Sequence, residues 1–117
     1  EQMFIKSEAC RIVNEAKDSG HKVCAVGTSV MRAIETATGT DGHLKEYEGW
    51  TNKFIFPPYD FVLPDAMVTN FHMPLSTMLM LVCSYGGYEL VMDAYQEALK
   101  EDYRFGTYGD AMLILNK

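Results

Sequence analysis

Apolar residues recur along this chain at helical spacing, and short apolar runs separate the helical stretches. The first helix is predicted to begin at Ser7 as its N-cap and to end at Gly20, where a C-cap glycine is expected. Its apolar residues are spaced i, i+3, i+4 and i+7: Ala9, Ile12, Val13 and Ala16. The run 22–26 then predicts a short buried strand.

A second helix is predicted after a tight turn at 27–29. One of its faces is apolar: Val30, Ala33, Ile34 and Ala37. Gly39 and Gly42 interrupt the next stretch, which is predicted to be a loop, and so is the segment around Trp50. From 53 to 71, Phe, Ile and Val residues predict two or three strands, separated by prolines.

The last part of the chain predicts two helices and a strand. Ser76 is the expected N-cap of a helix in which residues 78–83 leave no polar face, so this helix should be buried on nearly all sides. Gly86 and Gly87 end it. The next helix is amphipathic, with these residues predicted to face inward: Leu90, Val91, Ala94, Tyr95, Ala98 and Leu99. The run 111–115 predicts a final buried strand.

This order of helices and strands predicts the α/β class, with a partly parallel sheet flanked by helices. A length of 117 residues suits one domain or a piece of one, and residues 1–117 are expected to form a single α/β segment. In such sheets, ligands bind beyond the carboxyl ends of the strands. The loops 27–29 and 70–76 are therefore the candidate ligand loops, because each follows a predicted strand and opens a helix.

Charge and composition limit the partners of the chain. Its formal net charge is −6, whereas surfaces that bind nucleic acid are usually basic, so the chain alone is predicted to bind nucleic acid poorly. No apolar run approaches the roughly 20 residues that span a bilayer, and no membrane partner is expected. The three cysteines, Cys10, Cys24 and Cys83, lie in apolar patterns and are predicted to be buried, reduced thiols of a cytoplasmic protein.

The turn at 27–29 offers groups that bind phosphate, carboxylate or ribose hydroxyls. Gly27 allows close backbone approach, Thr28 and Ser29 supply hydroxyls, and the start of a helix supplies free amides. The alternative is that the hydroxyls only cap the helix. Arg32, one helical turn further, is compatible with a ligand contact or with a solvated or salt-bridged surface position. The Walker lysine and the spaced glycines of a dinucleotide site are absent.

Asn70 and His72 form the second polar candidate. Either could be structural, since Asn side chains often bind their own turn and a lone His is commonly a hydrogen-bonded structural residue. No second His or Cys lies at metal-ligand spacing, so no metal site is expected. Trp50 could stack on a base or belong to the core.

Five stretches along nearly the whole chain resemble one known family: "AVGTSVMRAIE", "GWTNKFIFPPYDF", "DAMVTNFHMPLSTMLMLV", "GGYELVMDAYQEAL" and "YRFGTYGDAMLIL". They are similar to the C-terminal third of the S-adenosylmethionine:tRNA ribosyltransferase-isomerase family, which acts in queuosine biosynthesis. The resemblance implies that this chain is the C-terminal part of a larger two-domain enzyme. It would belong to the main α/β domain, with a β-barrel domain inserted before it.

The resemblance also implies a reaction and its partners. Family members transfer the ribosyl moiety of S-adenosylmethionine to an aminomethyl-deazaguanine at the tRNA wobble position and isomerise it, giving epoxyqueuosine, adenine and methionine. The implied tRNAs have a GUN anticodon and carry aspartate, asparagine, histidine or tyrosine. S-adenosylmethionine is then a ribosyl-donor substrate, no metal is needed, and a cytoplasmic monomer is expected.

The match to the family holds at specific residues. Gly27, Thr28 and Arg32 match an element that commonly reads Gly-Thr-Thr-Ser-Val-Arg, whereas 29–31 depart from it and leave the role of the central hydroxyl open. The other matching residues are Gly49, Trp50, Thr51, Thr69, Asn70, Phe71, His72, Pro74, Ser76, Thr77, Gly87, Tyr88, Glu89, Tyr103, Arg104, Phe105, Tyr108, Gly109 and Asp110.

The implied chemistry needs a base at the carbon next to the sulfonium and an acid that assists the departure of adenine. The titratable candidates for catalysis are His72, Glu89 and Asp110. The candidates for binding S-adenosylmethionine are Gly27, Thr28, Ser29, Arg32 and Asn70. Two alternatives stay open: a non-catalytic structural half-domain, and another kind of S-adenosylmethionine-binding α/β domain.

Overall fold

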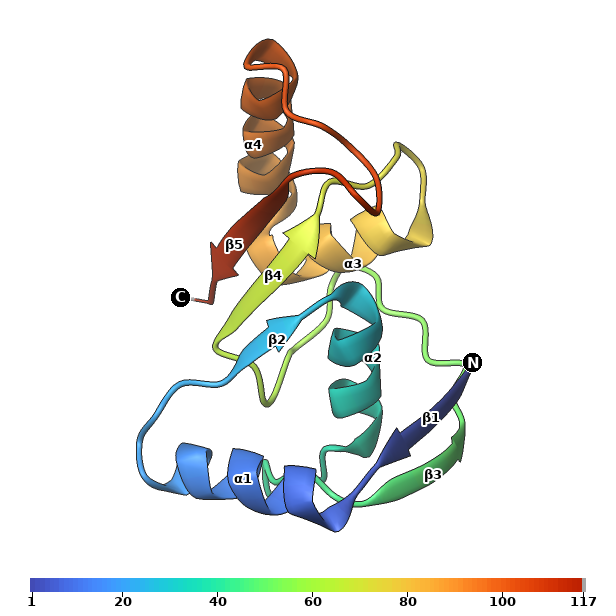
Figure 1. The fold of residues 1–117 in the computed structure, drawn as a ribbon, viewed down its shortest axis with the longest axis vertical. Helices are drawn as coiled ribbons and strands as arrows, with labels where there is room; N and C mark the ends of the chain where they lie inside the picture. The colour runs from blue at the N-terminus through green and yellow to red at the C-terminus, as the bar shows by residue number, and fades with distance from the viewer. Residues whose placement is uncertain (117) are drawn as a thin grey trace.

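The computed structural model describes residues 1–116. The strands are β1 (Gln2–Ile5), β2 (Cys24–Val26), β3 (Tyr47–Trp50), β4 (Ala66–Asn70) and β5 (Ala111–Leu115), and the helices are α1 (Ser7–Asp18), α2 (Thr28–Ala37), α3 (Thr77–Gly86) and α4 (Tyr88–Lys100). Figure 1 shows α1 and the β1–β3 pair at one end of the molecule and α4 at the other. Within the described residues, none of the helices combines the length and hydrophobicity needed to cross a membrane.

Three strands form the central sheet, in the order β2-β4-β5. β2 runs parallel to β4, and β5 runs antiparallel to it, so the predicted α/β class with a partly parallel sheet is confirmed. The direction of β5 follows from the path of the chain. The segment after α4 returns to the carboxyl end of β4, where Asn70 pairs with Ala111, and β5 therefore runs the opposite way. β1 and β3 form a separate antiparallel pair.

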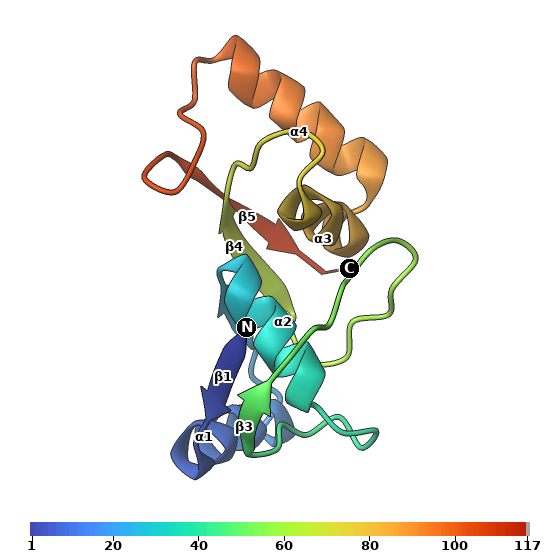
Figure 2. The same ribbon diagram turned by 90° about the vertical axis from the view of Figure 1, so that its right-hand side faces the viewer.

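The main core lies between the central sheet and the helices α3 and α4, which Figure 2 shows on one side of the sheet. Alternate strand residues, including Ala25, Met67 and Ile114, point to this side and are buried. A second cluster belongs to the part formed by β1, β3, α1 and α2: Met3, Cys10, Ala37, Leu44 and Leu63. Ile34 of α2 packs against both clusters and connects them.

No helix of residues 1–116 covers the other face of the sheet. Val26, Leu113 and Leu115 are 64%, 61% and 67% exposed, and the strand register places them on the same face. The prediction that these strands are buried is therefore wrong for this face. Cys24, predicted to be buried, is exposed on it, whereas Cys10 and Cys83 are buried as predicted.

Two or three strands were predicted between 53 and 71, but this segment contains one strand, β4. Residues 53–63 form no strand, because Pro57 and Pro58 lack the N–H groups that a strand ladder needs and the coil binds α2 instead. β1 and β3 were not expected, and β3 lies where a loop was predicted. Gly49 weakens the strand pattern of β3, and its partner β1 lies far away in the sequence.

Two predicted helix ends are confirmed. The Oγ of Ser76 accepts a hydrogen bond from the N–H of Leu79 at 3.1 Å and caps α3. Gly20 follows α1 with a φ of +80°, and the N–H of His21 donates to the carbonyl of Ala16 at 2.9 Å. This is the hydrogen bond of a helix end that turns through a left-handed glycine.

Two other predictions about the helices are wrong. Lys6, not Ser7, is the N-cap of α1, because β1 continues to Ile5 and the extended chain turns directly into the helix. The inward face of α4 is also narrower than predicted. Its buried residues are Val91, Tyr95 and Ala98, whereas Leu90 and Leu99 are both 57% exposed.

Candidate functional site

The loops after β2 and β4 lie next to each other at one edge of the sheet, as predicted. β2 and β4 are parallel neighbours, so their carboxyl ends meet there. The N–H of Gly27 donates to the carbonyl of Val68 at 2.8 Å, which fixes the first loop against β4. α2 and α3 begin from the two loops, at Thr28 and Thr77. Each helix start adds unpaired N–H groups and a partial positive charge to this edge.

α2 begins without a side-chain cap. Its N-cap residue is Gly27, whose φ of 100° is a conformation that favours glycine, and no side chain bonds the first amides. Thr28 is only 8% exposed, and its hydroxyl has no hydrogen-bond partner within residues 1–116. Ser29 is exposed. The alternative that these hydroxyls cap the helix is therefore wrong, and the first amides of α2 remain available to a ligand.

A cavity of about 30 Å³ lies between the first turns of α2 and α3 and the coil 53–55. Two hydroxyls, two cations and four apolar side chains line it: Thr28, Thr77, Arg32, Lys53, Phe54, Ile55, Met78 and Leu81. No carboxylate is among them. The polar groups of the lining are thus mainly hydrogen-bond donors.

Lys53 reaches this cavity because the coil folds back onto α2. The N–H of Lys53 donates to Oγ1 of Thr51 at 3.2 Å, and this Oγ1 lies 3.0 Å from Oγ1 of Thr36 on α2. The Nζ of Lys53 lies 5.4 Å from the centre of the Tyr59 ring. Sequence reasoning missed Lys53, since no local pattern shows that the coil returns to α2. It also missed Thr77 as a site residue, although Thr77 directly follows the predicted helix cap.

Arg32 forms an ion pair at the edge of the cavity. Its Nη2 lies 2.8 Å from Oε1 of Glu1, and both side chains are partly exposed. The guanidinium thus has the salt-bridged surface position that the sequence left open, and it also lines the cavity.

Asn70 holds the turn that precedes β5. Its Nδ2 donates to the carbonyl of Asp110 at 3.0 Å and to that of Gly109 at 3.4 Å. The carboxylate of Asp110 accepts the N–H of Arg104 at 2.7 Å. The amide donor of Asn70 therefore serves the fold, whereas its Oδ1 faces no hydrogen-bond donor within residues 1–116.

His72 is half-buried, and its surroundings favour the neutral imidazole. Desolvation by burial lowers the pKa of its imidazole below the usual 6.5. Its Nε2 lies 2.8 Å from Oγ1 of Thr69, and this hydroxyl also donates to the carbonyl of Asn70 at 3.1 Å. Because the hydroxyl has a single hydrogen, Nε2 is the donor whenever that bond to Asn70 is formed. Nδ1 is then a free acceptor, which is the form that a general base needs.

Glu89 is exposed in the first turn of α4. Six residues further along α4, the hydroxyl of Tyr95 accepts the backbone N–H of His72 at 2.9 Å. Six residues of helix correspond to about 9 Å. This rise separates Glu89 from Tyr95 along the helix, whereas Asn70 contacts the backbone of Asp110 at the end of β4, two residues before His72.

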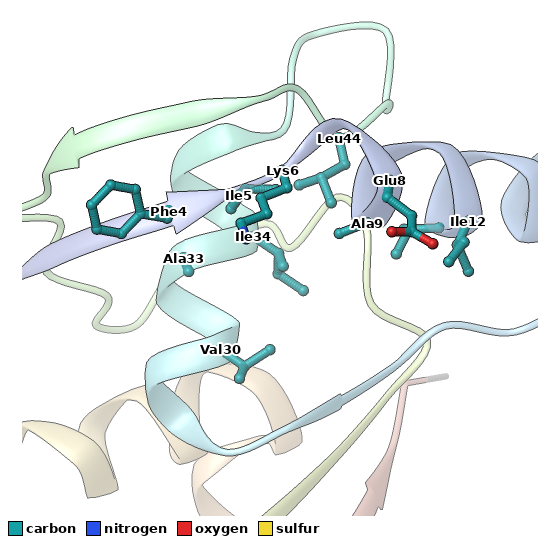
Figure 3. A pocket seen from close by; sticks show the side chains of 11 residues that line it. Phe4, Ile5, Lys6, Glu8, Ala9, Ile12, Val30, Ala33, Ile34 and Leu44 are labelled. Atoms are coloured by element: carbon teal, nitrogen blue, oxygen red, sulfur yellow. The ribbon is translucent and has the colours of Figure 1, made fainter.

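A much larger groove, of about 570 Å³, lies between β1, α1 and α2. Figure 3 shows its mostly apolar side chains, among them Phe4, Ile12 and Val30, with Lys6 and Glu8 as the charged ones. This groove lacks the converging polar groups that orient a small polar ligand. Elsewhere in residues 1–116, no group of three or more His, Cys, Asp and Glu side chains is arranged to hold a metal ion.

Comparison with known proteins gives the family. A family model described as "Queuosine biosynthesis protein" matches residues 1–114. The S-adenosylmethionine:tRNA ribosyltransferase-isomerase of Phocaeicola vulgatus is 75% identical over all 117 residues, and that of Bacteroides fragilis is 74% identical. In both cases the match covers 100% of this chain and 33% of the relative, so the chain spans about a third of the length of these curated relatives.

A solved structure agrees with these matches. The crystal structure of S-adenosylmethionine tRNA ribosyltransferase from Thermotoga maritima superimposes with a TM-score of 0.89 and 47% sequence identity. The superposition covers 96% of this chain and 39% of that protein. The resemblance recognised in the five sequence stretches is thereby confirmed, and this chain belongs to the queuosine biosynthesis protein family.

Proposed function

We propose that this chain is the C-terminal third of an S-adenosylmethionine:tRNA ribosyltransferase-isomerase and contributes residues 1–117 to its main α/β domain. The observation that carries this proposal is the 75% identity, over the whole chain, to a relative of that name. The polar edge formed by the loops after β2 and β4 supports it, because ligands of α/β sheets bind at such edges.

The proposed reaction transfers the ribosyl moiety of S-adenosylmethionine to an aminomethyl-deazaguanine at the tRNA wobble position. Isomerisation of this ribosyl group gives epoxyqueuosine, and adenine and methionine are released. The proposed partners are S-adenosylmethionine and tRNAs with a GUN anticodon. We place the enzyme in the cytoplasm as a monomer, without a metal.

Within this reaction, His72 is the proposed general base at the carbon next to the sulfonium. Its support is the lowered pKa, which leaves the imidazole unprotonated at neutral pH, together with the free acceptor at Nδ1. Asp110, which is exposed beside the same loop, stays a titratable candidate for the catalytic site without an assigned role. Glu89, exposed in the first turn of α4, is a further titratable candidate.

A second candidate function is a purely structural half-domain, with all chemistry in the rest of the enzyme. The hydrogen bonds of Asn70 to the carbonyls of Gly109 and Asp110 favour this function, because they give Asn70, which matches the family, a role in the fold.

An assay of adenine release from S-adenosylmethionine distinguishes the catalytic function from the structural one. It uses the full-length enzyme and tRNA that carries the precursor base. His72→Gln should lower kcat by about a hundredfold or more if His72 is the base. The matched control is His21→Gln, because His21 is exposed and lies beyond α1. Melting temperatures should match wild type in both variants. A kcat within twofold of wild type for folded His72→Gln would favour the structural function.

A further inference from the structure

The cavity between the starts of α2 and α3 has the composition of an anion site. Two helix N-termini border it, and each carries roughly half a positive charge. Arg32 and Lys53 add two full positive charges, and no Asp or Glu is among the lining residues. These positive charges attract an anion and repel a cation.

Thr28 provides an independent indication of a ligand. Its side chain is more than nine-tenths buried, lines the cavity, and makes no hydrogen bond within residues 1–116. No side-chain nitrogen or oxygen of the described residues is completely buried without a partner, so the hydroxyl of Thr28 keeps some access. A ligand oxygen in the cavity would give this accessible hydroxyl the hydrogen-bond partner that the described residues do not supply.

The size of the cavity restricts the ligand. Its volume of about 30 Å³ exceeds the roughly 10–15 Å³ that one water molecule needs but stays small. A carboxylate, or the non-bridging oxygens of one phosphate, can enter, whereas a purine or a ribose is too large. The site therefore accepts the end of a larger molecule that lies outside it.

The two cations are available to such a group. Lys53 forms no ion pair within residues 1–116 and lies over the ring of Tyr59. Arg32 uses one nitrogen, Nη2, for the carboxylate of Glu1, and its other guanidinium nitrogens have no partner in the described part of the chain. That ion pair also shows that an oxygen anion is accommodated at the edge of the cavity.

We propose that this cavity is an oxyanion subsite in which Thr28, Lys53 and Arg32 bind one carboxylate or phosphate group of a substrate. The chemistry is shared by two sources. One is the carboxylate of the methionine moiety of S-adenosylmethionine, and the other is a backbone phosphate of tRNA. Naming these two sources rests on the proposed function, whereas the subsite itself does not.

The first test does not depend on activity. The melting temperature of the full-length enzyme is measured with increasing inorganic phosphate, and with sodium chloride at equal ionic strength. Phosphate should stabilise wild type beyond chloride, because a ligand of the folded state raises its stability. Thr28→Val and Lys53→Met should lose this extra stabilisation. Thr28→Ser retains the hydroxyl, and Lys22→Met removes an exposed lysine from the other end of β2, so both should keep it.

Two binding experiments then identify the source. If the carboxylate of S-adenosylmethionine occupies the subsite, Lys53→Met weakens S-adenosylmethionine binding about tenfold and leaves binding of decarboxylated S-adenosylmethionine unchanged. If a tRNA phosphate occupies it, the same variant weakens tRNA binding and reduces the slope of log K against log salt by about 1.

The outcomes are distinguishable. Equal phosphate stabilisation and equal binding of all three ligands in wild type, Thr28→Val and Lys53→Met would overturn the oxyanion subsite. Absence of adenine release by wild type would instead overturn the proposed function, and the phosphate experiment would still decide the subsite.

Discussion

Replacing Glu35 tests how the coil that carries Lys53 is held in place. Glu35 lies on α2 and is only 6% exposed. Its carboxylate accepts the N–H of Val62 at 3.2 and 3.3 Å and the N–H of Leu63 at 3.3 Å. These bonds attach the coil after the prolines to the helix, in place of the strand ladder that the coil lacks.

The loss of stability in Glu35→Ala depends on whether the N–H groups of Val62 and Leu63 find another hydrogen-bond acceptor. Val62 is half-exposed, so its N–H can bind water, whereas Leu63 is buried and its N–H would be left without a partner. An unsatisfied buried donor costs about 1–3 kcal/mol, and the lost bond to the Val62 N–H adds about 1 kcal/mol. We expect Glu35→Ala to reduce the free energy of unfolding by about 2–4 kcal/mol. Glu35→Gln retains one acceptor oxygen and should cost about 1 kcal/mol.

Equilibrium urea unfolding followed by far-UV circular dichroism measures these differences, provided that the transition is two-state. The matched control is Glu97→Ala, because Glu97 is an exposed helical residue of α4 and its loss should change stability by less than about 0.5 kcal/mol. If Glu35→Ala were no more destabilising than this control, the carboxylate would not be holding the coil.

Three further predictions concern the helix cap, the histidine and the division of the enzyme. Ser76→Ala should lower the free energy of unfolding by about 1 kcal/mol in the same urea experiment, because Ser76 caps α3; an unchanged midpoint would contradict the cap. The folded pKa of His72 is below its unfolded value of 6.5, so its contribution to stability is complete above that value. Unfolding free energy should therefore decline as the pH drops below 6.5 towards the folded pKa, and His72→Gln should lack this part of the decline. Finally, this chain alone should release no adenine from S-adenosylmethionine. Both substrates must be held with their reacting atoms within about 3–3.5 Å of each other, and the rest of the enzyme is proposed to supply the other wall of the substrate pocket. Turnover by this chain within a hundredfold of the full-length enzyme would refute the proposal that the rest of the enzyme is needed.

The parts of the fold that local patterns encode could be predicted from the sequence. α3, α4, β2 and β4 follow from apolar spacing, from Ser76 and from the glycines that end the helices. β1 and β3 could not be predicted, because each depends on the other across a long separation and Gly49 interrupts the pattern. The uncovered sheet face was mispredicted for a different reason. Apolar residues on both faces of a strand indicate burial on both faces, but residues 1–116 cover only one.

The sequence predicts where the site lies, but it does not predict which side chains contact one another there. Parallel strands that lead into helices place the loops 27–29 and 70–76 at one edge, whatever the side chains do. Lys53 and Glu35 could not be assigned, because their roles depend on a coil without secondary structure that folds onto α2. The contacts that fix it join residues 15 and 27–28 positions apart in the sequence.

The two loops differ in how completely they satisfy their own polar groups. In the loop after β4, Asn70 donates to the next turn, His72 bonds Thr69, and Ser76 caps α3. In the loop after β2, no side chain caps α2, and the buried hydroxyl of Thr28 has no partner within residues 1–116. Because the uncapped first amides of a helix bind water or a ligand, the loop after β2 is the one that can bind an external anion. The loop after β4 thus holds the proposed base His72 by hydrogen bonds of the fold, whereas the loop after β2 keeps its donors available for the proposed oxyanion subsite.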